Sequence, residues 1–111
     1  MPELTPQQMK VFERLFVAGF RPIAIPPYEN ALCVRRGECA AVLTPVPNGG
    51  LRMLAPATYI IDGNLSVKLK KGKSEVFVWK KREIEATPER LKELEAFRDE
   101  LTSILEEGTP Q

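Results

Sequence analysis

Residues 58–81 read TYIIDGNLSVKLKKGKSEVFVWKK, and this stretch decides the fold. Its pattern is extended and not helical, and apolar and polar residues alternate at residues 65–70 with the two-residue period of a β-strand that has one buried face. Asp62-Gly63 is a favoured two-residue hairpin turn, and Gly72 supplies the positive φ that the next turn needs. The stretch therefore predicts three consecutive antiparallel strands, at residues 58–61, 64–70 and 74–81.

The chain before this meander is also extended, and turn-forming residues divide it into shorter pieces. Pro26-Pro27 is one such break, and the proline- and glycine-rich run at residues 45–50 is another. We expect further strands at residues 20–25, 31–34, 38–44 and 51–54.

A helix is predicted before the strands. Thr5-Pro6-Gln7-Gln8 combines an N-cap threonine, a proline at the first helical position and a glutamine placed for a capping box. The helix should cover residues 6–18 and end at Gly19. Its expected buried face consists of Met9, Phe12, Leu15 and Phe16, with Val11 at the margin.

A second helix is predicted after the strands, because Thr87-Pro88 repeats the same start. It runs to Gly108, and Glu95 and Arg98 are spaced to form an ion pair on its outer surface. Its apolar stripe consists of Leu91, Leu94, Phe97, Leu101, Ile104 and Leu105.

These elements predict an α+β fold in which an antiparallel β-meander sheet of about five to seven strands is flanked by an N-terminal and a C-terminal helix. A chain of 111 residues fits one domain, which we assign to residues 1–107, with a frayed tail at residues 108–111. The chain shows no leader-like start, no run of about 20 apolar residues and only two cysteines, so we expect a cytoplasmic protein without a membrane segment. The abundance of glutamate leans toward a thermophilic source.

The sequence contains no histidine. This excludes serine–histidine and cysteine–histidine nucleophiles and nearly every catalytic zinc site. A metal-dependent enzyme built on Asp62 and Glu75 is a third hypothesis, and Phe77 stands where such a site needs a lysine. We predict no cofactor, no bound metal and no catalytic residue.

Charge is separated along the C-terminal half. Residues 65–82 carry seven basic residues and one acid, whereas residues 83–111 carry nine acids and three basic residues. One interpretation is that the acidic helix packs near the basic hairpin at residues 68–82 and neutralises it. The other is that this hairpin exposes a basic surface to phosphates or to an acidic partner.

Two predicted turns carry paired basic residues before a glycine. If both turns lie at one end of the sheet, they form a cationic rim that could bind a polyanion such as nucleic acid. The candidate binding residues are Arg35, Arg36, Lys68, Lys70, Lys71, Lys73 and Trp79.

The register of this hairpin decides which side chains share a face with Trp79. A two-residue loop at Lys71-Gly72 places Phe77 and Trp79 beside the lysines, where they could stack on bases. A three-residue loop places both aromatic rings with the leucines in the core. The second register is favoured, because the first forces Lys71 to positive φ.

The two cysteines lie on neighbouring predicted strands. A three-residue loop at their turn would place Cys33 directly opposite Cys39. They lack the partners of a zinc site, so we interpret them as small buried hydrophobic residues.

The leading functional hypothesis is a non-catalytic binding or assembly module that acts through protein–protein contacts at a sheet edge or helix face, as a homodimer or with a protein partner. It depends on the missing catalytic chemistry and on apolar residues beyond what the fold can bury, namely Leu4, Val17, Tyr28 and Ile84. The alternative is nucleic-acid or polyanion binding by the basic hairpin.

Overall fold

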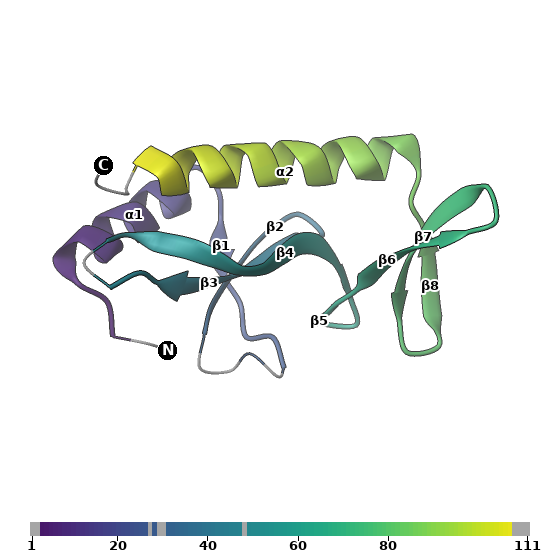
Figure 1. Cartoon of the computed structure of the whole chain (residues 1–111), viewed down its shortest axis with the longest axis horizontal. Coiled ribbons are helices and arrows are strands. Elements are labelled where there is room, and N and C mark those ends of the chain that lie inside the picture. Colours follow the sequence, from purple (N-terminus) through teal and green to yellow (C-terminus); the bar gives the residue numbers. More distant parts are fainter. Residues whose placement is uncertain (1–2, 27, 29–30, 48, 108–111) are drawn as a thin grey trace.

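The computed structural model describes residues 3–26, 28, 31–47 and 49–107. The predicted tail at residues 108–111 lies outside them. In chain order (Figure 1) the elements are α1 (Pro6–Val17), β1 (Arg21–Pro22), β2 (Leu32–Arg36), β3 (Cys39–Pro45), β4 (Leu51–Ile61), β5 (Asn64–Leu65), β6 (Val67–Lys71), β7 (Ser74–Trp79), β8 (Arg82–Glu85) and α2 (Pro88–Glu107).

The strands form two antiparallel sheets. β1 to β5 make a five-stranded sheet in chain order, and β6 to β8 make a three-stranded sheet. Figure 1 shows α2 running along the molecule from the three-stranded sheet at one end to α1 at the other. The predicted α+β fold with a meander between two terminal helices is confirmed, but the expected single sheet is divided in two.

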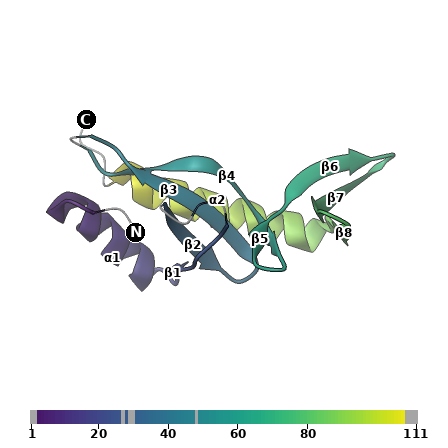
Figure 2. The ribbon, with the colours of Figure 1, turned by 90° about the horizontal axis from the view of Figure 1, so that it is seen from below.

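The division occurs at Ser66, inside the strand that was predicted to run unbroken over residues 64–70. Its backbone N–H and its hydroxyl both donate to the carbonyl of Tyr59, at 3.0 and 2.7 Å. The hydroxyl also lies 3.2 Å from Oγ1 of Thr58, so the buried side chain of Ser66 is hydrogen-bonded. Beyond it, the chain leaves β4 and pairs with β7 instead (Figure 2).

β4 is longer than predicted, because residues 51–54 and 58–61 belong to one strand of eleven residues. The register with β3 shifts twice, between Ala40 and Val42 and between Val42 and Leu43. These β-bulges accommodate extra β4 residues around Leu54 and Pro56. Proline is tolerated in strands at bulges and on sheet edges, so β4 continues through Pro56.

Both helices pack on the same face of the five-stranded sheet. The buried residues of the α2 stripe share one core with Val11 and Leu15 of α1 and with Phe20, whose ring meets that of Phe97 edge-on at 5.1 Å. The segment after β1 covers the opposite face, where Ile25 is fully buried. The α2 stripe was therefore predicted correctly.

α1 begins as predicted, with Thr5 and Gln8 forming a capping box. Its buried face was predicted in part: Leu15 is buried and Phe12 packs against the core, but Met9 and Phe16 are about half-exposed, and Gln8 is buried instead. The polar Gln8 is accommodated because its amide donates to the carbonyls of Val46 and Gly49, at 3.2 and 3.3 Å. Thus α1 closes the loop between β3 and β4.

The loop of the β6–β7 hairpin differs from both alternatives, but the faces are those of the two-residue alternative, with Phe77 on the same face as Lys68 and Lys70. Lys71 pairs with Ser74, so the loop is the two residues Gly72 and Lys73, and Lys68 lies opposite Phe77. The preferred register was wrong, because Gly72 at φ 62° opens a two-residue turn while Lys71 stays in the strand. Phe77 is nevertheless in the core, as expected, since this face of the small sheet packs against β4.

Two further strand boundaries depart from the prediction. β1 comprises only Arg21–Pro22 of the strand expected at residues 20–25. β8, Arg82–Glu85, was not predicted, because its sequence contains a single apolar residue, Ile84. Its pairing with β7 makes the third strand of the small sheet.

Of the apolar residues counted as surplus, Leu4, Tyr28 and Ile84 are partly buried against the two cores, and Val17 is 87% exposed. Neither α1 nor α2 combines the length and the continuous apolar character that a bilayer-spanning helix requires.

Candidate binding cleft between the two sheets

A cleft of about 540 Å³ lies where the two sheets separate. Residues 55–58 of β4 line one side, and residues 65–68 line the other. The lining is completed by Trp79 of β7, by Leu94 and Arg98 of α2, and by Pro26 and Tyr28. The cleft exists because the chain departs from β4 at Ser66 and leaves a wedge between the diverging strands.

The β4 side of the cleft is a sheet edge. β5 pairs only with Ile60 and Ile61, so within the described part of the chain residues 51–57 have β3 as a neighbour on one side and no strand on the other. Unpaired edge strands present backbone N–H and C=O groups that can pair with another chain. Pro56 has no N–H to donate, whereas the other residues of this segment keep theirs.

Most of the lining is apolar. Trp79 is half-buried and packs against the main core, and Leu94 is 8% exposed. Pro26 and Tyr28 extend this surface on the other face of the sheet. Lys80 Nζ lies 5.5 Å from the centroid of the Trp79 ring and covers part of it.

Two cations accompany this surface. Lys68 Nζ forms an exposed ion pair with Glu75 at 3.5 Å. Arg98 is exposed and has no ion-pair partner among the described residues, so the expected pair with Glu95 is not formed. Arg98 also borders a second hollow of about 350 Å³ along residues 53–57. A cation thus stands beside the free edge of β4 from Met53 to Thr58.

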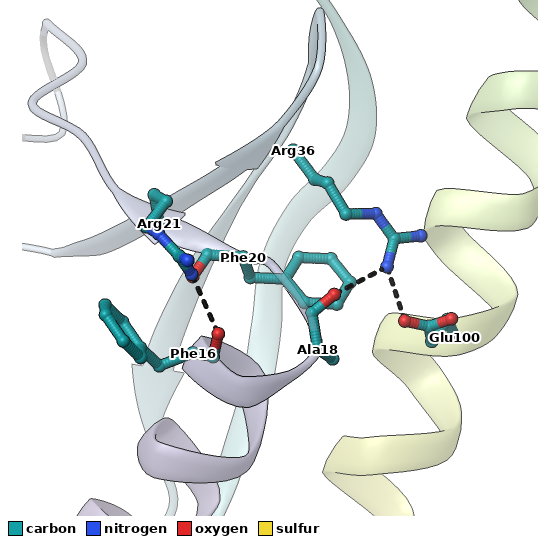
Figure 3. A network of polar contacts seen from close by, with 6 residues as sticks. All are labelled: Phe16, Ala18, Phe20, Arg21, Arg36 and Glu100. Carbon is teal, nitrogen blue, oxygen red and sulfur yellow. Dashed lines mark hydrogen bonds and ion pairs between the residues drawn. The ribbon is translucent and has the colours of Figure 1, made fainter.

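The predicted polyanion-binding residues are not gathered into one site. Arg36 donates to the carbonyl of Ala18 at 3.1 Å and forms an ion pair with Glu100 of α2, and its guanidinium lies 4.4 Å from the centroid of the Phe20 ring (Figure 3). Arg21 binds the carbonyl of Phe16 nearby, at 2.8 Å. Two arginines therefore satisfy carbonyls at the C-terminal end of α1.

The turn after Arg36 lies against α2. Arg35 donates to the carbonyl of Gly37, at 2.8 Å, and sits 3.8 Å from the Glu38 carboxylate. A Cβ at Gly37 would lie 2.8 Å from Oε1 of Glu93, so glycine permits this approach. The turn between β6 and β7 instead forms one extremity of the molecule in both views (Figures 1 and 2). The two basic turns therefore do not form a common rim.

The lysines of the small sheet are exposed. Lys71 pairs with Glu83 at 3.1 Å, within the same sheet. Lys70 and Lys73 have no ion-pair partner among the described residues. No ion pair between described residues joins this sheet to α2, so the expected neutralisation by the acidic helix is not seen as direct contacts.

The cysteines are buried, as expected, but they do not face each other. Cys33 pairs with Val42 and Cys39 with Arg36, which places the thiols in different cores. The prediction failed because the turn has two residues and not three. Burial, followed by the charge of Glu93, raises the pKa of Cys39 to about 12.

The carboxylates proposed for a metal site are already engaged. Asp62 lies 3.8 Å from Arg82, and Glu75 pairs with Lys68. Within the described residues, no three acidic or cysteine side chains are grouped to hold a metal ion. The hydroxyl of Tyr59 donates to Glu93 at 2.7 Å, and burial, together with this hydrogen bond, raises the tyrosine pKa.

Of the residues that line the cleft, the sequence had singled out Trp79 and Lys68, as candidates for polyanion binding, but not Arg98 or the edge at residues 55–57. A proline between two alanines, in an otherwise extended segment, is the local signal of an exposed edge. The position of Arg98 beside that edge follows from helix packing and has no local signal. The chain matches no protein-family model, no curated protein and no solved structure.

Proposed function

We propose that this protein is a non-catalytic binding module that holds an extended segment of a partner protein in the cleft between its two sheets. The observation that carries this proposal is the free edge of β4, which runs beside an apolar cleft. A strand added there pairs with the edge of β4 in the position that the chain would occupy if it continued to pair with β4 beyond Ser66. Backbone hydrogen bonds supply affinity in this mode, and pockets beside the edge supply specificity.

The shape of the site favours a chain segment over a compact ligand. The edge from Met53 to Thr58 is six residues, or about 20 Å at roughly 3.3 Å per residue. Hollows of about 540 and 350 Å³ lie along it and share residues 55–57 and Arg98. An extended peptide contacts both hollows at once.

The same lining argues against single-stranded nucleic acid. Binding of that kind needs open aromatic faces beside a track of cations. Phe77 is fully buried, and Trp79 is half-buried and partly covered by Lys80. The exposed Lys70 and Lys73 favour polyanion binding only at the hairpin tip, which remains the second candidate function.

A different protein is a better partner than a second copy of this chain. β6 carries Lys68, Lys70 and Lys71, and antiparallel self-pairing would set lysines against lysines. We therefore propose a heterologous protein partner, and dimerisation lost on blocking the cleft would contradict this.

The test uses Trp79, the single tryptophan, as a reporter inside the cleft. Linear twelve-residue peptides are selected from a random phage library on the wild-type protein. The blocking variant is Pro56→Tyr, because Pro56 is exposed and borders both hollows. The matched control is Pro47→Tyr, because Pro47 is exposed, lines neither hollow and belongs to the β3–β4 loop at the other end of the molecule.

We expect selected peptides to shift Trp79 emission and to bind Pro56→Tyr at least about tenfold more weakly, while Pro47→Tyr binds as the wild type does. Light scattering and thermal melts show whether each variant is folded and monomeric. Failure to enrich any peptide, or equal binding by Pro56→Tyr, would overturn the proposal.

A further inference from the structure

We propose that the segment held in the cleft is an acidic strand whose carboxylates alternate with apolar side chains. This inference rests on the proposed function and specifies the chemistry of the partner. It comes from the charges beside the edge and from the different surroundings of its two faces.

The inference depends mainly on the position of Arg98. It stands on α2 beside the β4 edge, borders both hollows and has no carboxylate partner among the described residues. Guanidinium groups bind carboxylates through two parallel hydrogen bonds, which fix both charge and orientation. An acidic side chain arriving on this face would supply the missing partner.

The β6 side of the cleft is also positively charged. Lys68 lines the cleft, and its one ion pair, with Glu75, is exposed and easily exchanged. Lys70 follows two residues later on the same face of β6 and has no ion-pair partner among the described residues. A basic strand would be repelled from both walls, whereas an acidic strand is attracted to both.

The alternation follows from the two faces of an added strand. Successive side chains of a strand point to opposite faces of its sheet. On one face of β4 lie Arg98 and Leu94 of α2, and on the other lie Pro26 and Tyr28. Acidic residues of the added strand on the α2 face would pair with Arg98, and its apolar residues on the other face would pack against Pro26 and Tyr28.

The probes are three fluorescein-labelled peptides of eight residues, in which valine alternates with glutamate, glutamine or lysine. Fluorescence anisotropy measures their binding to the wild-type protein at about 50 and 150 mM salt. The test variant is Arg98→Glu, and the matched control is Lys92→Glu. Lys92 is also exposed on α2 but does not line the cleft.

We expect the glutamate peptide to bind about tenfold more tightly than the glutamine peptide, with the lysine peptide weakest. Arg98→Glu should abolish this preference and favour the lysine peptide. Lys92→Glu should stay within about twofold of the wild type, because Lys92 lines neither hollow.

The outcomes separate this inference from the proposed function. Equal binding of all three peptides, lost in Pro56→Tyr, would refute acidic selection and keep the binding cleft. Equal weakening by Lys92→Glu and Arg98→Glu would show only general charge attraction and would also refute the inference. If no peptide binds but oligothymidylate does, both proposals fail in favour of nucleic acid.

Discussion

The ring of Phe77 stacks on the ring of Tyr59, with centroids 4.8 Å apart and an interplanar angle of 8°. Phe77 belongs to β7 of the small sheet, and Tyr59 belongs to β4 of the large sheet. The Tyr59 hydroxyl also donates to Glu93 of α2. This contact therefore joins both sheets and α2 next to the cleft.

Replacing Phe77 with alanine should detach the small sheet. The ring is fully buried, and truncation of such a residue costs about 3–5 kcal/mol. Chemical denaturation measures the change, and Leu69→Ala, on the exposed face of β6, is the control. A cost of less than about 1 kcal/mol for Phe77→Ala would show that the stack does not hold the sheets together.

Leu101→Ala should destabilise the main core by about 2–5 kcal/mol, because Leu101 is fully buried between α2 and the sheet. Val17→Ala should change the unfolding free energy by less than about 0.5 kcal/mol, since Val17 is 87% exposed. Thermal melts of both variants check the comparison. Equal melting temperatures would contradict the packing of α2.

Arg36 and Glu100 should be measurably coupled in a double-mutant cycle with Arg36→Gln and Glu100→Gln. The pair is partly exposed, so we expect a coupling of only about 0.5–1 kcal/mol. The matched cycle at Lys71 and Glu83, which are 64% and 44% exposed, should give close to zero. Equal coupling energies for the two pairs would mean that the ion pair between Arg36 and Glu100 of α2 stabilises the fold no more than an exposed surface pair does.

The buried Cys39 thiol predicts a loss of stability at high pH. Its pKa is about 12 in the folded protein, against an ordinary value of 9.0. Above pH 9 the unfolded chain therefore binds fewer protons than the folded state, and the free energy of unfolding falls as pH rises toward 12. Below pH 9 this contribution is fully present.

Urea unfolding at pH 7, 9 and 10.5 measures this trend. Cys39→Ala should show a shallower decline, with the remainder coming from Tyr59, whose pKa is also raised. An identical pH profile for the variant would exclude the thiol as the cause. Both thiols should resist Ellman's reagent at pH 8 until the protein unfolds, because they are buried.

Replacing Lys68, Lys70, Lys71 and Lys73 with glutamine should change stability by less than about 1 kcal/mol at 20 or 500 mM salt. Their ion pairs are exposed and lie within the small sheet. A large destabilisation that vanishes in high salt would show that they balance the acidic helix after all. An oligonucleotide titration of the parent protein tests the polyanion hypothesis in parallel.

Local sequence determined most of the secondary structure. The caps at Thr5 and Thr87 set both helix starts, and hydrogen bonds from Gln8 and Arg90 to these threonines are present. Asp62-Gly63 made its two-residue turn, with φ of 51° and 78°. These features follow from groups within a few residues of one another, so no knowledge of the fold was needed.

The candidate cleft was decided only by tertiary structure. The pairing of Ser66 with Tyr59, the bulges beside Pro56 and the placement of Arg98 each depend on contacts between segments distant in the chain. A one-residue change of register moves every side chain to the other face, so alternation alone could not place Phe77 with respect to Lys68. The sequence determined which residues form strands and helices. Tertiary structure decided that residues 64–65 pair with β4 and residues 67–71 pair with β7, and this change of partner sets where the sheets separate and where the β4 edge stays open.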